Sequence, residues 1–190
     1  MDQESLRQCF NQLSEGIKVC IEKDLTTPSL ILIYSAIDIA GWLNSENPGE
    51  PVKNRFISWV ERYLLPAKEL KCSAIELYGA RCGLVHSLSP ESDVSKKGAA
   101  RKIIYSSRTN KPDELQEMIM LAKISDYIPV KVEDLFEAYC QGLDVFLKEL
   151  LADPSKAANV YDKATSIFIT LTDQERKDLI QWGKTLLGQS

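Results

Sequence analysis

Histidine and paired cysteines, on which most zinc and disulfide sites depend, are scarce in this sequence. His86 is the only histidine among 190 residues, and the five cysteines show no C-x-x-C spacing. The sequence therefore argues against a histidine-ligated metal site and against a disulfide framework. We expect reduced cysteines packed as core residues, with no metal and no cofactor. The cysteines are Cys9, Cys20, Cys72, Cys82 and Cys140.

Long hydrophobic runs and glycine-rich nucleotide motifs are also missing. The most apolar stretch, residues 30–37 (LILIYSAI), is much shorter than the roughly 20 residues needed to span a bilayer. The N-terminal MDQESLRQCF has neither the basic leader nor the apolar segment of a signal peptide. No P-loop, G-x-G-x-x-G or G-x-S-x-G motif occurs. These absences predict a cytoplasmic protein with no membrane partner.

Helical periodicity, by contrast, runs through most of the chain. Apolar residues recur at spacings of three and four, and two short stretches, 103–107 and 127–132, have β character and are expected to pair. The predicted fold class is mainly α: a single antiparallel helical bundle with a minor two-stranded β element. The whole chain, 1–190, forms one domain, with a core bundle of about 5–152 and C-terminal helices of about 154–187 packing on it. Helices are predicted near 6–20, 27–43, 51–66, 73–88, 113–124 and 135–151, and after Asp153 and Thr172.

Several helix ends carry capping signals. Thr27 before Pro28 is typical of an N-cap followed by proline at the first helical position. Ser73 with Glu76, and Thr172 with Glu175, match the S/T-x-x-E capping box. These signals predict where three of the helices begin.

Arg81 stands at a position that the apolar pattern assigns to the core. On the helix after Ser73, Leu77, Arg81 and Leu84 fall on one stripe. A guanidinium keeps its proton, so a buried one needs a carboxylate or phosphate partner. Asp38 is the only charged residue of the otherwise apolar helix 27–43 and faces the same problem. An internal Arg81–Asp38 ion pair is therefore predicted, and by itself it requires no further function.

His86 lies five residues after Arg81, about 140° around a regular helix. A histidine whose pKa is near neutrality can move a proton to or from a ribose 2′-OH or a departing 5′-oxygen, and arginine can stabilise the charge on the phosphorane. Small residues precede His86 on its own stripe, which suits a dimer interface or tight packing equally. Cys82 and His86, at i and i+4, also have the spacing of a thiolate pair, although buried cysteines are usually inert.

A basic strip follows this helix. Six bases and no acid occur between Val94 and Pro112, in a chain whose net charge is −4. Such a strip on an acidic body can hold a phosphate backbone locally, and it can equally be a solvated loop kept soluble by lysine. The candidate nucleic-acid-binding residues are Lys96, Lys97, Arg101, Lys102, Arg108 and Lys111.

The sequence Arg81-Cys-Gly-Leu-Val-His86 resembles the R-x4-6-H motif of the HEPN (higher eukaryotes and prokaryotes nucleotide-binding) superfamily, and residues 5–152 resemble its helical bundle. The resemblance implies a metal-independent endoribonuclease acting as a homodimer with both motifs in one cleft. Arg81 and His86 would be catalytic, with Asp38, Tyr78 and Cys82 supporting them. RNA or a nucleotide, and in toxin or defence systems a neutralising protein, would be the partners.

The match departs from the family at Cys82, where active members often have a polar residue, frequently asparagine. Some relatives also resemble noncatalytic binding or scaffold domains. Three interpretations therefore remain open: a HEPN-type endoribonuclease, a noncatalytic nucleotide-binding, RNA-binding or protein-interaction module on the same fold, and a structural Arg81–Asp38 pair with His86 capping a helix.

Overall fold

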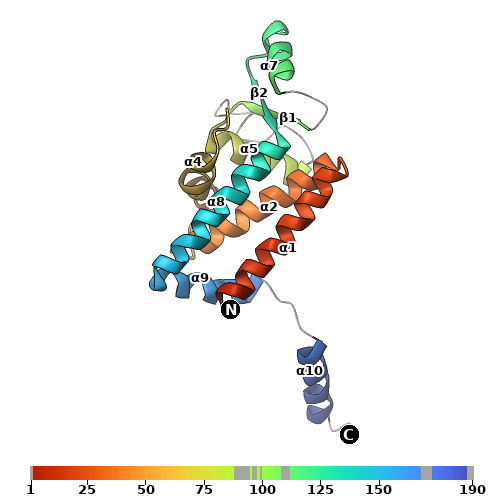
Figure 1. Ribbon diagram of the computed structural model, residues 1–190, viewed down its shortest axis with the longest axis vertical. Coiled ribbons are helices and arrows are strands. Elements are labelled where there is room, and N and C mark those ends of the chain that lie inside the picture. The colour runs from red at the N-terminus through yellow and green to blue at the C-terminus, as the bar shows by residue number, and fades with distance from the viewer. Residues whose placement is uncertain are drawn as a thin grey trace.

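The computed structural model describes residues 2–87, 95, 98, 100–107, 112–167 and 173–187, and the described chain is mainly helical (Figure 1). The predicted fold class, helices with a minor two-stranded element, is confirmed. The strands are β1 (Lys102–Ser106) and β2 (Tyr127–Lys131). The helices are α1 (Gln3–Glu22), α2 (Thr26–Asn44), α3 (Val52–Trp59), the π-helical η1 (Val60–Leu64), α4 (Leu65–Ala67), α5 (Ala74–Ser87), α7 (Pro112–Leu121), α8 (Val132–Ala152), α9 (Pro154–Ile167) and α10 (Asp173–Leu186).

Helix α2 forms the centre of the bundle, in contact with α1, α3, α5, α8 and α9. Figure 1 shows α1, α2 and α8 running side by side, with α9 crossing one end. Ile33, Tyr34, Ile37 and Ala40 of α2 are completely buried, as expected for a helix that is apolar nearly all round. Among the described residues, α2 is also the one helix long and apolar enough to cross a membrane, but half of that stretch is buried within the bundle, as a core helix would be.

The two strands form a parallel pair in which Lys102 faces Tyr127 and Ser106 faces Lys131. A parallel pair needs a crossover connection, and α7 lies in the segment between the strands. The predicted pairing of the two β segments is therefore confirmed. Because β1 also contacts α5, the sheet brings Lys102 of the basic strip next to the helix that carries Arg81.

The capping signals have different outcomes. The Ser73–Glu76 box is confirmed, since the backbone N–H of Ser73 donates to Glu76 Oε2 at 2.8 Å. Asp153 caps α9 by accepting from the backbone N–H of Lys156 at 3.0 Å. The Thr27 cap is wrong: α2 already begins at Thr26 after Leu25, because proline is tolerated throughout a first turn whose N–H groups have no helical acceptor. The Thr172 cap lies outside the described residues.

One π-helical turn interrupts the third predicted helix. Pro66 lacks the N–H that would bond to Arg62 in an α-helix, and the N–H of Leu65 bonds to the carbonyl of Val60, five residues back. Gly142 of α8 lies directly against this turn: a Cβ atom there would stand 2.7 Å from the Tyr63 carbonyl oxygen. The absent side chain is what lets α8 approach the turn closely.

The last two helices differ in their contacts. Ala157, Val160 and Ala164 of α9 are buried against the bundle. Packing on the bundle was expected for α10 too, but Trp182 is 63% exposed, like the other large apolar residues of that helix. Figure 1 shows α10 standing apart from the bundle.

Replacing Gly142 with alanine tests the close approach of α8 to the π-helical turn. We expect Gly142→Ala to destabilise the protein by about 1 to 3 kcal/mol, because the new methyl group meets backbone atoms that cannot turn aside. Gly16→Ala on α1 is the matched control, because nothing lies within 4 Å of its Cβ position and helix propensity favours alanine by about 0.5 to 1 kcal/mol. Urea unfolding measures both, and equal effects would contradict the packing described.

Candidate functional site

The predicted ion pair between α5 and α2 is present. Both Nε and Nη2 of Arg81 lie 2.7 Å from Oδ2 of Asp38. The Arg81 side chain is 15% exposed and the Asp38 side chain is 21% exposed. The helical pattern suggested a core position for Arg81, but the pair is not fully buried. The pKa of Arg81 is raised: burial opposes the charge, and the hydrogen bond and attraction to Asp38 outweigh it. Arg81 is thus permanently charged and held in one orientation at the edge of the core.

Tyr78 and Cys82 lie one turn apart beside Arg81. The Tyr78 ring packs on Phe56 with centroids 5.6 Å apart. Its pKa is raised, first by burial and then by a hydrogen bond with Cys82. Tyr78 therefore connects this stretch of α5 to the apolar core, and Cys82 is hydrogen-bonded to Tyr78.

His86 lies in the last turn of α5, whose backbone continues to Ser87. Its side chain lies outside the described residues. Arg81 and His86 lie on one continuous helix.

Two of the six bases of the basic strip, Arg101 and Lys102, are described, and each contacts another side chain of the same chain. Arg101 Nε donates to Glu76 Oε1 at 2.6 Å. The Lys102 ammonium stands over the Tyr127 ring, 5.4 Å from its centroid. Lys96, Lys97, Arg108 and Lys111 lie outside the described residues.

Glu76 joins two separate interactions. It completes the capping box of α5 through Ser73, and it accepts from Arg101. The carboxylate is 7% exposed. Burial by itself raises its pKa, but the hydrogen bonds from Arg101 and Ser73 prevail and lower it. Arg101 therefore anchors the strip to the start of α5.

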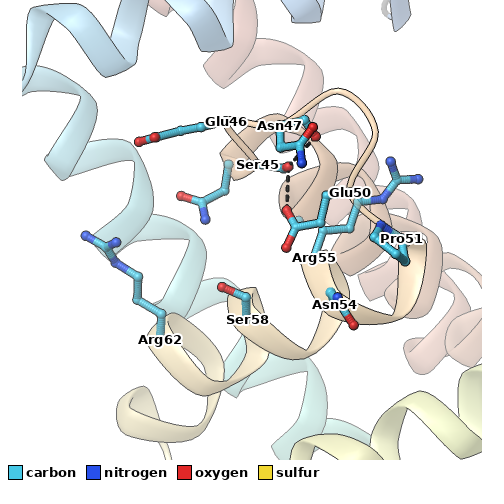
Figure 2. A pocket seen from close by; sticks show the side chains of 11 residues that line it. Ser45, Glu46, Asn47, Glu50, Pro51, Asn54, Arg55, Ser58 and Arg62 are labelled. Carbon is cyan, nitrogen blue, oxygen red and sulfur yellow. Dashed lines mark hydrogen bonds between the residues drawn. The ribbon is translucent and has the colours of Figure 1, made fainter.

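A polar cavity of about 460 Å³ lies apart from the Arg81 site, between the end of α2 and the start of α3 (Figure 2). The Ser58 hydroxyl points into it, and Ser45 donates to Glu50 at 2.5 Å across its rim. Glu46 and Arg62 project from opposite sides in Figure 2. With both signs of charge in its lining, the cavity favours no single ligand class.

A half-buried polar network that the sequence did not predict adjoins this cavity at Asn44. The Tyr63 hydroxyl, which has one proton to donate, lies 2.7 Å from Glu149 Oε2 and 3.1 Å from Asn44 Oδ1. Lys156 donates to both Tyr63, at 2.7 Å, and Glu149, at 2.9 Å. Its members come from η1, α2, α8 and α9, far apart in sequence, so no local pattern signals it. The polar Gly/Pro-containing loop NSENPGEP was the one available hint of the cavity.

The residues described contain no group of three or more His, Cys, Asp or Glu side chains placed to hold a metal ion. All five cysteines are free, and of these only Cys72 is fully buried. Its pKa is raised to about 12, mainly by burial, which makes it an unreactive thiol near neutral pH.

Compared with family models, curated proteins and solved structures, the chain matches none of them.

Removing Arg81 tests the energetic importance of the α5–α2 pair. We expect Arg81→Ala to lower the free energy of unfolding by about 2 to 3 kcal/mol, less than the roughly 3 to 5 kcal/mol of a fully buried pair, because Asp38 regains some water. Arg62→Ala is the control: its side chain is 57% exposed and also bonds a carboxylate, and it should cost about 0 to 1 kcal/mol. Equal losses in the two variants, measured by urea unfolding, would show that burial of the Arg81 pair adds nothing.

The Glu76 interactions predict a pH dependence. The folded-state pKa lies below the unfolded value of about 4.5, so the stabilisation is complete above that value and is lost as pH falls through the folded pKa. We expect Glu76→Gln to be less stable than wild type at pH 7, with the difference shrinking below pH 4.5. Thermal melting from pH 7 to pH 3 measures this, and a constant difference would contradict the lowered pKa.

Proposed function

We propose that the protein is a HEPN-like, metal-independent endoribonuclease of the cytoplasm, in which Arg81 and His86 act on RNA at the cleft of a homodimer. The observation that carries the proposal is the Arg81–Asp38 pair. A guanidinium held by one hydrogen bond and a second ion-pair contact, yet still 15% exposed, is fixed in direction and reachable from solvent. Catalysis by charge stabilisation needs both properties, because a preorganised donor costs no reorganisation during reaction.

The reaction takes its nucleophile from the substrate. His86 removes the proton of the ribose 2′-OH, the freed oxygen attacks the adjacent phosphorus, and Arg81 stabilises the charge on the phosphorane. The bond to the 5′-oxygen then breaks, and that oxygen leaves with a proton supplied by the His86 of the second copy. The products are a 2′,3′-cyclic phosphate and a 5′-OH end.

Asp38 has a positioning role in this scheme. Both Arg81 nitrogens bond to one of its oxygens, which fixes the plane of the guanidinium, while Tyr78 and Cys82 pack beside it. A role in a toxin or defence system, with a neutralising partner protein, belongs to the same proposal.

A noncatalytic nucleotide- or RNA-binding module is the second candidate, and two observations favour it. Arg101, one of six bases proposed to hold RNA, is already paired with Glu76. Cys82 follows Arg81 where active relatives of the resembled family often have a polar residue. On this alternative the Arg81–Asp38 pair is structural, and the strip binds without cleavage.

Cleavage of single-stranded RNA in EDTA distinguishes the endoribonuclease from the noncatalytic module. We expect wild type to leave 2′,3′-cyclic phosphate ends and to spare DNA, which lacks the 2′-OH. His86→Ala should reduce the rate by about 10² to 10⁴, the usual contribution of a positioned proton-transfer group. Gel analysis of end-labelled RNA and its termini measures both effects.

Lys148→Ala, an exposed substitution on α8, is prepared in the same way and should cleave at the wild-type rate. RNA binding without cleavage, unchanged by His86→Ala, would establish the noncatalytic module instead. Cleavage that persists in His86→Ala would refute the assignment of the site.

A further inference from the structure

The polar cavity between α2 and α3 has side chains in its lining that are held by contacts outside it. Arg62 Nη2 donates to Glu149 Oε1 at 3.2 Å and to Oε2 at 3.0 Å, and Asn44 Oδ1 lies 3.1 Å from the Tyr63 hydroxyl. Glu149 and Tyr63 belong to the polar network, so this network positions two lining residues. The Nε and Nη1 atoms of Arg62 are not used by Glu149, and the Asn44 amide nitrogen is not used by Tyr63.

The loop that closes the other side of the cavity is ordered by its own hydrogen bonds. Ser45 donates to Glu50 Oε2 at 2.5 Å and to the Asn47 carbonyl at 3.0 Å. The Gly49 N–H donates to Asn47 Oδ1 at 2.9 Å. Polar groups that are already in place need not be ordered when a ligand binds, and this lowers the cost of binding.

The two signs of charge in the lining come from different elements. Glu46 and Glu50 belong to the loop after α2, whereas Arg55 lies on α3 and Arg62 lies on η1. Figure 2 shows Glu46 and Arg62 projecting from opposite sides. Neither an anion nor a cation is favoured, because each would be repelled by one pair of these charges. A ligand that carries one ammonium group and one carboxylate complements both pairs.

The size of the cavity suits a small molecule. Its volume of about 460 Å³ falls within the roughly 300 to 1,000 Å³ of small-molecule sites. An adjoining hollow shares part of the lining and extends over Ile57 of α3, which is partly buried. The shared residues are Glu50, Asn54, Ser58 and Arg62. A polar ligand with an apolar side chain therefore has a surface for each part.

We propose that this cavity binds a small zwitterion, either a free α-amino acid or a short peptide. The ammonium group lies at Glu46 and Glu50, and the carboxylate lies at Arg62. The Ser58 hydroxyl, which points into the cavity in Figure 2, donates to the carboxylate, and an apolar side chain of the ligand lies over Ile57. The site is separate from the α5 site, and binding does not depend on the proposed endoribonuclease activity.

Equilibrium dialysis of the full chain with the standard amino acids and with the dipeptide glycyl-L-leucine tests the proposal. We expect at least one of them to bind. Its N-acetyl and C-terminal amide forms, which each lack one charge, should bind about tenfold more weakly or less. Tighter binding of the dipeptide than of any amino acid identifies a peptide as the occupant, and the reverse identifies a free amino acid. Absence of binding at up to about 10 mM, well above a Kd of 1 mM, would overturn the proposal, as would equal binding of the blocked forms.

Two substitutions test where the ligand lies. Glu46→Gln keeps the shape of the side chain but removes its charge, and Arg62→Ala removes the partner of the carboxylate. Each should weaken binding about tenfold, and Glu46→Gln should also reduce the preference for the free form over the N-acetyl form. Glu15→Gln on α1 is the matched control, because its side chain is 71% exposed outside the cavity, and it should bind as wild type does. Unchanged binding in either cavity variant would contradict the assigned site.

Discussion

The enclosure of α2 is the constraint on which the remaining structure depends. A helix that is apolar nearly all round must be covered on every side, and α1, α3, α5, α8 and α9 all contact it. Its single charge, Asp38, then needs a partner at the point where another helix covers it, and Arg81 of α5 supplies that partner. The ion pair thus follows from the burial of α2, and it sets the rotation of α5 about its own axis.

This origin gives the pair a role in specificity as well as stability. A buried ion pair contributes little net stability compared with apolar packing, but a mispaired charge is costly. Rotating α5 by one residue would leave both Arg81 and Asp38 without the other. The pair therefore disfavours alternative packings of α5, whichever chemistry the helix performs.

The features that the sequence predicted correctly were of two kinds. Some depend on a few neighbouring residues, and others on a single charged residue in an otherwise apolar pattern. The Ser73–Glu76 box needs only four residues, and the Arg81–Asp38 pair was predictable because each was the lone charge on an apolar stripe. The sequence did not reveal the Tyr63 network, in which the bonded residues Tyr63 and Lys156 are 93 residues apart. The π-helical turn depends on Pro66 and on Gly142 of another helix together, so neither residue alone predicts it. Helix α10 has an ordinary amphipathic pattern. Such a pattern predicts that one face packs against other apolar residues, but it does not identify them.

The basic strip and the sheet connect α7 to the start of α5. Arg101 bonds the start of α5 through Glu76, β1 continues directly from it, and β1 pairs with β2 along all five residues. Helix α7 lies between those strands in the chain. Helix α7 is therefore connected to α5 through one short parallel strand pair and the Arg101–Glu76 ion pair. The Glu76 carboxylate is also the cap of α5. Because the cap and the ion pair share Glu76, anything that displaces Arg101 also weakens the first turn of the helix that carries Arg81 and His86. The start of α5 is consequently the point at which the sheet is tied to the helix that carries Arg81.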